Sequence, residues 1–238
     1  MTLQARVIRR FTIGGIVLAG LLFLPAGSLH YWQGWLFLVL TLGFFVPGTL
    51  YIAKRDPQLT ERRMHYREKQ REQNIFKIVA SMIYFPALTL PGFDFRFGWS
   101  RAWVGGVPLW LVLAGAALVL AGNFLIFWVM LVNSFASRTI QVESGQRVVS
   151  IGPYAAVRHP MYAGIMLMLL GAPLALGSYV ALPAFLLVVP PIVYRLINEE
   201  KVLRRDLPGY VDYCRQRRFW LVPGGVVRRT HYAKFYRS

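Results

Sequence analysis

The sequence predicts an all-α, multi-pass transmembrane helical bundle of about six membrane segments. The 238 residues are 56% hydrophobic, and the mean hydropathy of +0.45 is too high for an ordinary soluble domain. Charges are also segregated, because Phe11–Ala53, Ala102–Ser137 and Pro160–Tyr194 contain no Asp, Glu, Lys or Arg. As a helix, the first of these runs would measure roughly 65 Å, which is enough to cross a hydrocarbon core of about 30 Å twice.

The first half of the chain predicts four helices separated by one strongly charged connector. An aromatic cluster that begins at His30 marks the turn between the first two helices. The connector, Lys54–Lys77, is too charged for hydrocarbon and is expected to be an amphipathic interfacial segment or a solvated link. The aromatic-rich stretch Phe93–Trp103 is expected to be a loop. The predicted helices are Phe11–Leu29, Tyr31–Ala53, Ile75–Pro91 and Pro108–Asn133.

The last apolar block, Pro160–Tyr194, predicts a tight helical hairpin that is broken at Gly177-Ser178. Each arm would hold about 17 residues and reach about 26 Å, which is marginal for a full membrane span. Pro190-Pro191 should kink the second arm. Before the hairpin, Thr139–Val142 and Arg147–Ile151 are weak candidates for short extended pieces.

The charge distribution predicts one integral membrane domain with both termini in the cytoplasm. If the N-terminus, the connector, residues 134–159 and the tail share one side, every Lys and Arg except Arg96 and Arg101 lies there. The positive-inside rule makes that side cytoplasmic. Within residues 1–238 we expect residues 1–133 to supply N-terminal helices. Residues 134–238 would then form a C-terminal region that ends in a basic cytosolic tail.

Several functional classes are disfavoured by composition. The net charge of +17 lies in blocks between apolar runs, so it predicts contact with a membrane and not with nucleic acid. The single Cys214 excludes an intramolecular disulfide framework, and the four scattered His residues show no metal-ligand spacing. The basic N-terminus resembles a signal peptide, but its apolar run is too long and lacks a convincing cleavage site.

The stretch Gly152–Gly164, GPYAAVRHPMYAG, gathers polar side chains between two apolar blocks. Pro160 disfavours helical dihedrals at His159 and suits the first turn of a helix, so His159 should be the N-cap. A helix N-terminus flanked by Arg158 and His159 can hold an anion. The alternative is that these two side chains only anchor the helix at the lipid headgroups.

Two adjacent acids, Glu199 and Glu200, follow the last apolar segment. Arg195 and Arg204 each lie four residues from one of them, so the pair could simply form ion pairs at a helix end. Paired carboxylates at a membrane boundary are also candidates for function. A ligand that carries positive groups and a carboxylate would fit between these acids and the start of the Pro160 helix.

Three pieces together, GPYAAVRHPMYAG, NEEKVLRRDLPGYVDYC and RRFWLVPG, resemble the C-terminal signature of isoprenylcysteine carboxyl methyltransferases, which are related to phospholipid N-methyltransferases. The resemblance covers about Asn133–Gly224, so it implies that residues 134–238 contain the cofactor-binding catalytic region. It implies an integral membrane enzyme that uses S-adenosylmethionine without a Rossmann domain, and no GxGxxG fingerprint is present. The chain departs from the family pattern at Ala155-Ala156 and at Leu207-Pro208.

The resemblance also implies site residues. Glu200 would be catalytic, and Arg217 or Arg218 would lie near the polar head of the acceptor. No metal is implied. The acceptor would be lipid-like or isoprenylated, would enter from the bilayer, and could be methylated on a carboxylate or an amine. Residues implied at the cofactor are Gly152, Tyr154, His159, Pro160, Tyr162, Glu199 and Glu200.

A second resemblance gives the alternative function. Membrane sterol reductases that use NADPH have a similar C-terminal layout, and Tyr213-Cys214 and Arg204-Arg205-Asp206 echo their pattern. Those enzymes usually carry a His-Arg step where this chain has Glu199-Glu200. Two acids suit a sulfonium better than the phosphates of NADPH, so the methyltransferase is favoured. A transporter or scaffold would be expected to show inverted repeats or charged residues within spans, and neither is seen.

Overall fold

The computed structural model describes residues 2–64, 71–136, 142 and 145–224, and every regular element in these ranges is helical. The prediction of an all-α chain is therefore confirmed for the described residues. The elements are α1 (Leu3–Ala26), α2 (Trp32–Arg55), α3 (Pro57–Met64), α4 (Arg71–Phe97), α5 (Trp99–Val104), α6 (Leu109–Val132), the 3-10 turn η1 (Gly152–Ala155), α7 (Pro160–Ala175), α8 (Ala181–Leu186), α9 (Val189–Asp206) and α10 (Tyr210–Gln216).

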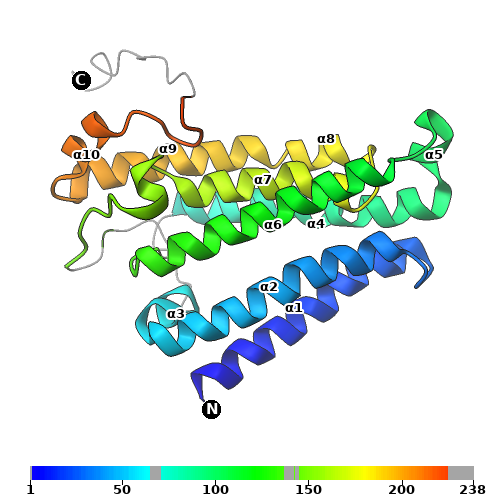
Figure 1. Ribbon diagram of the computed structural model, residues 1–238, viewed down its shortest axis with the longest axis horizontal. Coiled ribbons are helices and arrows are strands. Elements are labelled where there is room, and N and C mark those ends of the chain that lie inside the picture. The colour runs from blue at the N-terminus through cyan, green and yellow to red at the C-terminus, as the bar shows by residue number, and fades with distance from the viewer. Residues whose placement is uncertain (1, 65–70, 137–141, 143–144, 225–238) are drawn as a thin grey trace.

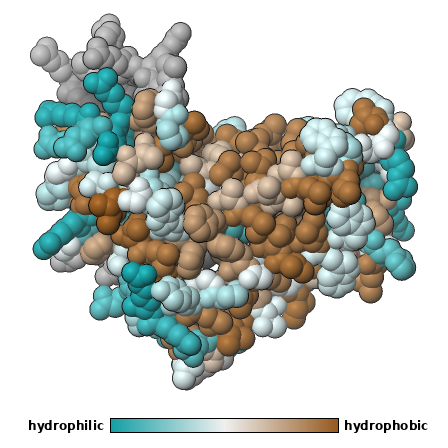
Figure 2. Space-filling view, in the orientation of Figure 1, coloured by the Kyte–Doolittle hydropathy of each residue, from teal (hydrophilic) through white to brown (hydrophobic). Residues whose placement is uncertain are grey.

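The long helices run side by side as a multi-pass membrane bundle (Figure 1). Within the described ranges, five stretches are long and apolar enough to cross a membrane, and α7 is a shorter apolar helix. Together they give the six predicted segments. Figure 2 shows apolar side chains over the middle of one face and polar side chains gathered at its two ends. The five stretches are Leu3–Ala26, Trp32–Arg55, Ile78–Phe97, Leu109–Val132 and Ala181–Asp206.

Helices α6 and α7 pack with their backbones in close approach, through two pairs of facing glycines. A Cβ atom added at Gly122 would lie 2.5 Å from the carbonyl oxygen of Gly164, and one at Gly115 would lie 2.7 Å from that of Gly171. Only residues without a Cβ allow this spacing, as is common between membrane helices. The packing fixes the start of α7 against the end of α6, where the polar residues gather.

The aromatic-rich stretch Phe93–Trp103 is not the loop that the sequence predicted. Helix α4 continues to Phe97 and α5 follows from Trp99. The reason is a buried carboxylate: Asp94 accepts hydrogen bonds from the Ser100 hydroxyl at 2.5 Å and from the Ser178 hydroxyl at 2.5 Å. These bonds order the segment and tie the turn between α7 and α8 to the end of α4.

The predicted break of the terminal hairpin at Gly177-Ser178 is confirmed, but the second arm is longer than predicted. Helix α7 ends at Ala175, just before Gly177-Ser178. The second arm runs from Ala181 to Asp206, long enough for a full span. The second arm is interrupted between α8 and α9, directly before Pro190-Pro191, which occupy the first turn of α9. The two prolines lack the N–H groups that would continue α8, so the interruption lies where the sequence predicted a disturbance of this arm.

The charged connector after α2 contains an ordered helix, α3. Asp56 accepts a hydrogen bond from the backbone N–H of Leu59 at 2.9 Å, which caps this helix. The Leu59 side chain is fully buried and packs with Ile52, Ile126 and Met130. Of the two weak extended candidates, residues 147–151 form no regular element, and 139–141 lie outside the described residues.

Candidate active site

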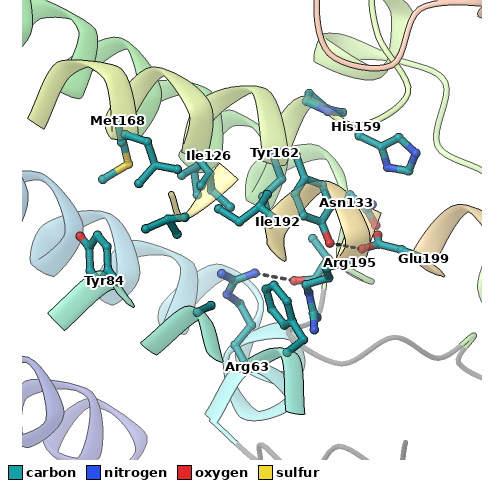
Figure 3. A pocket seen from close by; sticks show the side chains of 18 of the residues that line it. Arg63, Tyr84, Ile126, Asn133, His159, Tyr162, Met168, Ile192, Arg195 and Glu199 are labelled. Atoms are coloured by element: carbon teal, nitrogen blue, oxygen red, sulfur yellow. Dashed lines mark hydrogen bonds between the residues drawn. The ribbon is translucent and has the colours of Figure 1, made fainter. Parts of the chain in front are cut away.

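A cavity of about 580 Å³ lies between α7 and α9, and residues of α2, α3, α4, α6 and α8 also line it. Its size is that of a small-molecule site. Residues His159 to Ala172 line it, so it extends about 20 Å along α7. Figure 3 shows Tyr84 and Met168 toward one end, and His159 and Glu199 toward the other. The cavity therefore joins a polar end to a long apolar arm.

The turn before α7 brings Arg158 and His159 to the polar end. Gly152 has a φ of 58°, which favours glycine, and starts the η1 turn. His159 is the N-cap of α7 and Pro160 its first residue, as predicted. The backbone N–H groups of Arg158 and His159 donate to the carbonyl oxygens of Phe219 and Trp220, both at 2.9 Å. The segment after α10 thus holds this turn in place.

Glu200 lies at the centre of a buried network of charged and polar groups. Its Oε1 accepts a hydrogen bond from Arg158 Nη1 at 2.6 Å, and its Oε2 lies 2.6 Å from His159 Nε2. Arg204 Nη2 also donates to Oε1 at 2.8 Å, and the Tyr210 hydroxyl donates to Oε2 at 3.0 Å. Glu200, Arg158 and His159 are each at most 6% exposed. The carboxylate thus offsets the charge of Arg158 and orients both Arg158 and His159, two cavity residues, but it is not among the described residues that line the cavity.

Glu199, in contrast, lines the cavity. Its Oε2 accepts a hydrogen bond from the Tyr162 hydroxyl at 2.6 Å, which Figure 3 shows across the polar end. Successive helical residues point about 100° apart, so two adjacent acids on α9 face different surroundings. Glu199 is therefore a negative group presented to whatever occupies this end of the cavity.

A buried phenol lines the polar end, and a second phenol and a thiol lie behind it, against the Tyr154 carbonyl and Glu200. Burial raises the pKa of Tyr154, whose hydroxyl accepts a hydrogen bond from Asn133 Nδ2 at 2.8 Å. Burial also raises the pKa of Tyr213 to about 12, and its hydroxyl donates to the carbonyl oxygen of Tyr154 at 2.7 Å. Burial, and then the charge of Glu200, raise the pKa of the Cys214 thiol. Cys214 is therefore protonated near neutral pH and is no nucleophile.

The structure brings most of the predicted site residues together. Tyr154, His159, Pro160, Tyr162 and Glu199 line the cavity. Gly152 packs against the end of α6, where an added Cβ would lie 3.2 Å from Val132. The roles assigned to these residues stay predictions.

Arg217 and Arg218, predicted near the acceptor, are not among the cavity-lining residues. Their segment reaches the site differently, because the backbone carbonyl oxygens of the next two residues bind the Arg158-His159 turn. The Trp220 ring also lies beneath the Arg158 guanidinium, 5.4 Å from Cζ to the ring centroid. The contribution of this segment is structural support for the turn.

Among the described residues of the cavity wall, sequence reasoning missed one guanidinium and two amides outside the motifs. Arg63 comes from α3, Asn133 from the end of α6, and Gln146 from the segment before η1. A fourth, Arg195, was considered only as an ion-pair partner, although it also lines the wall. Charged residues at the ends of apolar runs were the available signal, but the sequence does not indicate which ones turn inward.

The fold and the cavity can now be compared with known proteins. Residues 110–207 match the phospholipid methyltransferase family model. The matched segment runs from α6 to just beyond α9 and so contains Tyr154, His159, Tyr162 and both acids of α9. No curated protein matches the chain. The match spans less than half of the chain, and it is consistent with the resemblance of the C-terminal half to membrane methyltransferases.

Proposed function

We propose that the protein is an S-adenosylmethionine-dependent membrane methyltransferase that acts on a lipid-like or isoprenylated acceptor. The observation that carries the proposal is one cavity with two unlike ends. A charged end, formed by the family-matched residues Arg158, His159, Tyr162 and Glu199, opens into an apolar arm, and the two together follow α7 for about 20 Å. A charged methyl donor suits the first end and a lipid tail suits the second.

The residues at the charged end fit the donor. S-adenosylmethionine carries a sulfonium, an ammonium and a carboxylate. Glu199 can offset the positive groups. Arg158 can take the carboxylate, because its buried Nε has no hydrogen-bond partner among the described residues although Nη1 binds Glu200. Glu200 and the Trp220 ring hold the Arg158 guanidinium at the cavity wall.

The protein's own side chains would orient the polar groups around the donor and exclude water from the site. When bound, the donor supplies a methyl group on a positively charged sulfur: a nucleophile can bond to the methyl carbon in one step while the sulfur leaves as a neutral thioether. The Tyr162 hydroxyl orients the Glu199 carboxylate, and Glu200 orients His159. The apolar wall below Tyr162 excludes water, which strengthens these electrostatic contacts. It is formed by Ile165, Leu169, Val188 and Ile192.

The acceptor nucleophile is a carboxylate or an amine in this proposal. A carboxylate is already nucleophilic and needs no base, whereas an ammonium must first lose a proton. The acceptor tail would enter from the bilayer. By the positive-inside rule, the end of the bundle that holds α3 and α10 (Figure 1) would face the cytoplasm, together with both termini.

Ligand-dependent thermal stabilisation tests the proposal. We expect S-adenosylmethionine, or its demethylated product S-adenosylhomocysteine, to raise the melting temperature of the protein in detergent. A ligand at a hundred times its dissociation constant adds about 2.7 kcal/mol, which corresponds to roughly 5 to 10 °C. NADPH should have no effect. Stabilisation by NADPH alone would instead support the sterol reductase alternative.

A further inference from the structure

The cavity wall contains a cation that comes from outside the family-matched segment. Arg63 lies on α3, far before residue 110 in the sequence, yet it lines the same cavity as Glu199 and Tyr162 (Figure 3). It also lies within electrostatic reach of the Tyr154 phenol, which belongs to the η1 turn. The charged connector therefore contributes directly to the polar end of the cavity.

The fold holds Arg63 in position. Its Nη1 donates to the carbonyl oxygen of Ala136 at 2.6 Å, which joins α3 to the segment after α6. Buried Leu59 anchors the same helix on α2 and α6. On the other side, Glu61 pairs with Arg6, and Arg10 Nη1 donates to the carbonyl oxygen of Met64 at 3.1 Å. A side chain on a helix fastened at three sides is preorganised to recognise a ligand.

The charges of the described wall indicate what that ligand carries. The lining includes three guanidiniums, of Arg63, Arg158 and Arg195, but only one carboxylate, that of Glu199. Arg158 is bound by Glu200, and Arg195 lies one helical turn before Glu199 on α9. Arg63 comes from a different helix, α3, and the carbonyl oxygen of Ala136 holds its Nη1 at the cavity wall. A positive wall in a partly apolar cavity favours a ligand that brings an anion.

We propose that Arg63 is a specificity-determining residue that binds an anionic group, a carboxylate or a phosphate, at the polar head of the acceptor. The inference rests on the proposed function, because it assigns the apolar arm to the acceptor tail. Arg158 and Glu199 then serve the donor, and Arg63 selects acceptors whose head is negatively charged. Neutral or cationic heads on the same tail would bind more weakly.

The test compares four single-chain amphiphiles that share one tail: oleate, oleyl phosphate, oleyl alcohol and oleylamine. Their dissociation constants are measured with the full chain in an uncharged detergent, at a mildly alkaline pH that ionises both acids. A charged hydrogen bond contributes about 1.5 to 3 kcal/mol, so oleate, oleyl phosphate or both should bind about ten- to a hundredfold more tightly than oleyl alcohol. A gain for only one of them identifies the acceptor anion as that chemical class.

Three variants separate recognition from folding. Arg63→Gln should remove the preference for the anion and leave the affinity for oleyl alcohol within about twofold, while Arg63→Lys should restore part of it. Arg55→Gln is the matched control, because Arg55 is exposed at the end of α2 and does not line the cavity. It should keep the full preference.

The inference is overturned if the wild-type protein binds oleyl alcohol as tightly as both anions. It is equally overturned if Arg63→Gln keeps the preference or if Arg55→Gln loses as much of it. S-adenosylhomocysteine binding is measured on the same samples. If the wild-type protein binds S-adenosylhomocysteine but shows no preference for the anions, only the role of Arg63 is refuted. If the wild-type protein does not bind S-adenosylhomocysteine, the proposed function is refuted.

Discussion

Glu200→Gln is expected to lower the melting temperature of the detergent-purified protein by roughly 6 to 20 °C. The substitution removes the charge that holds Arg158, His159 and Arg204 together and leaves a buried guanidinium uncompensated. Removing one partner of a buried ion pair costs about 3 to 5 kcal/mol, and for a chain of this size each kcal/mol corresponds to about 2 to 4 °C. Thermal unfolding followed by circular dichroism measures this loss.

Cys214 provides a second readout of the same change. Its Sγ lies 3.6 Å from Glu200 Oε1, and the charge of Glu200 is one of the causes that raise the thiol pKa. Without that charge the thiol pKa falls, so more thiolate is present at a given pH, and alkylation of this single cysteine should be faster. Asp212→Asn is the control, because Asp212 pairs with Arg215 on the exposed side of α10. If Glu200→Gln is no more destabilising than this control, Glu200 does not organise the site.

Glu199→Gln is expected to weaken S-adenosylmethionine binding at least tenfold while the protein remains folded. Glutamine keeps an oxygen that can accept the Tyr162 hydrogen bond but lacks the charge that would offset the donor's cationic groups. A lost charged hydrogen bond of about 1.5 to 3 kcal/mol corresponds to roughly ten- to a hundredfold in affinity. Calorimetric titration measures the dissociation constant, and the melting temperature without ligand checks the fold.

Glu199→Asp is the matched variant for charge. It retains the carboxylate on a shorter side chain, so it should bind the donor more tightly than Glu199→Gln. Unchanged affinity in Glu199→Gln would show that the carboxylate does not face the donor. The contrast with Glu200→Gln is itself informative, since neighbouring acids should separate into a binding defect and a stability defect.

This separation marks a limit of the sequence as a predictor. The uncharged runs predicted the membrane segments, because hydrocarbon excludes unsatisfied charges whatever the tertiary packing. The step from His159 to Pro160 likewise predicted the start of α7, since its cause is local. The sequence also predicted that the α9 acids would lie close to His159. It could not divide their roles, because the direction in which each carboxylate points depends on the packing of α9 against α7 and α10.

Long-range contacts explain what was missed. The helix through Phe93–Phe97 depends on Asp94 binding Ser100 and Ser178, and Ser178 lies far away in the sequence. Arg63 belongs to a segment whose charges resemble those of any solvated connector, and only the packing of Leu59 turns α3 toward the cavity. The place of Arg217 and Arg218 near the acceptor stays a prediction, but the support that the backbone after them gives to the Arg158-His159 turn could not be predicted from the sequence.

The most direct measurement follows a labelled methyl group from S-adenosylmethionine into membrane lipids, with mass spectrometry as the readout. Membranes that contain the wild-type protein should accumulate a labelled lipid-like product, and membranes with Glu199→Gln, or without the protein, should not. If S-adenosylmethionine binds but equal label appears in all three membranes, the cavity between α7 and α9 does not catalyse methyl transfer.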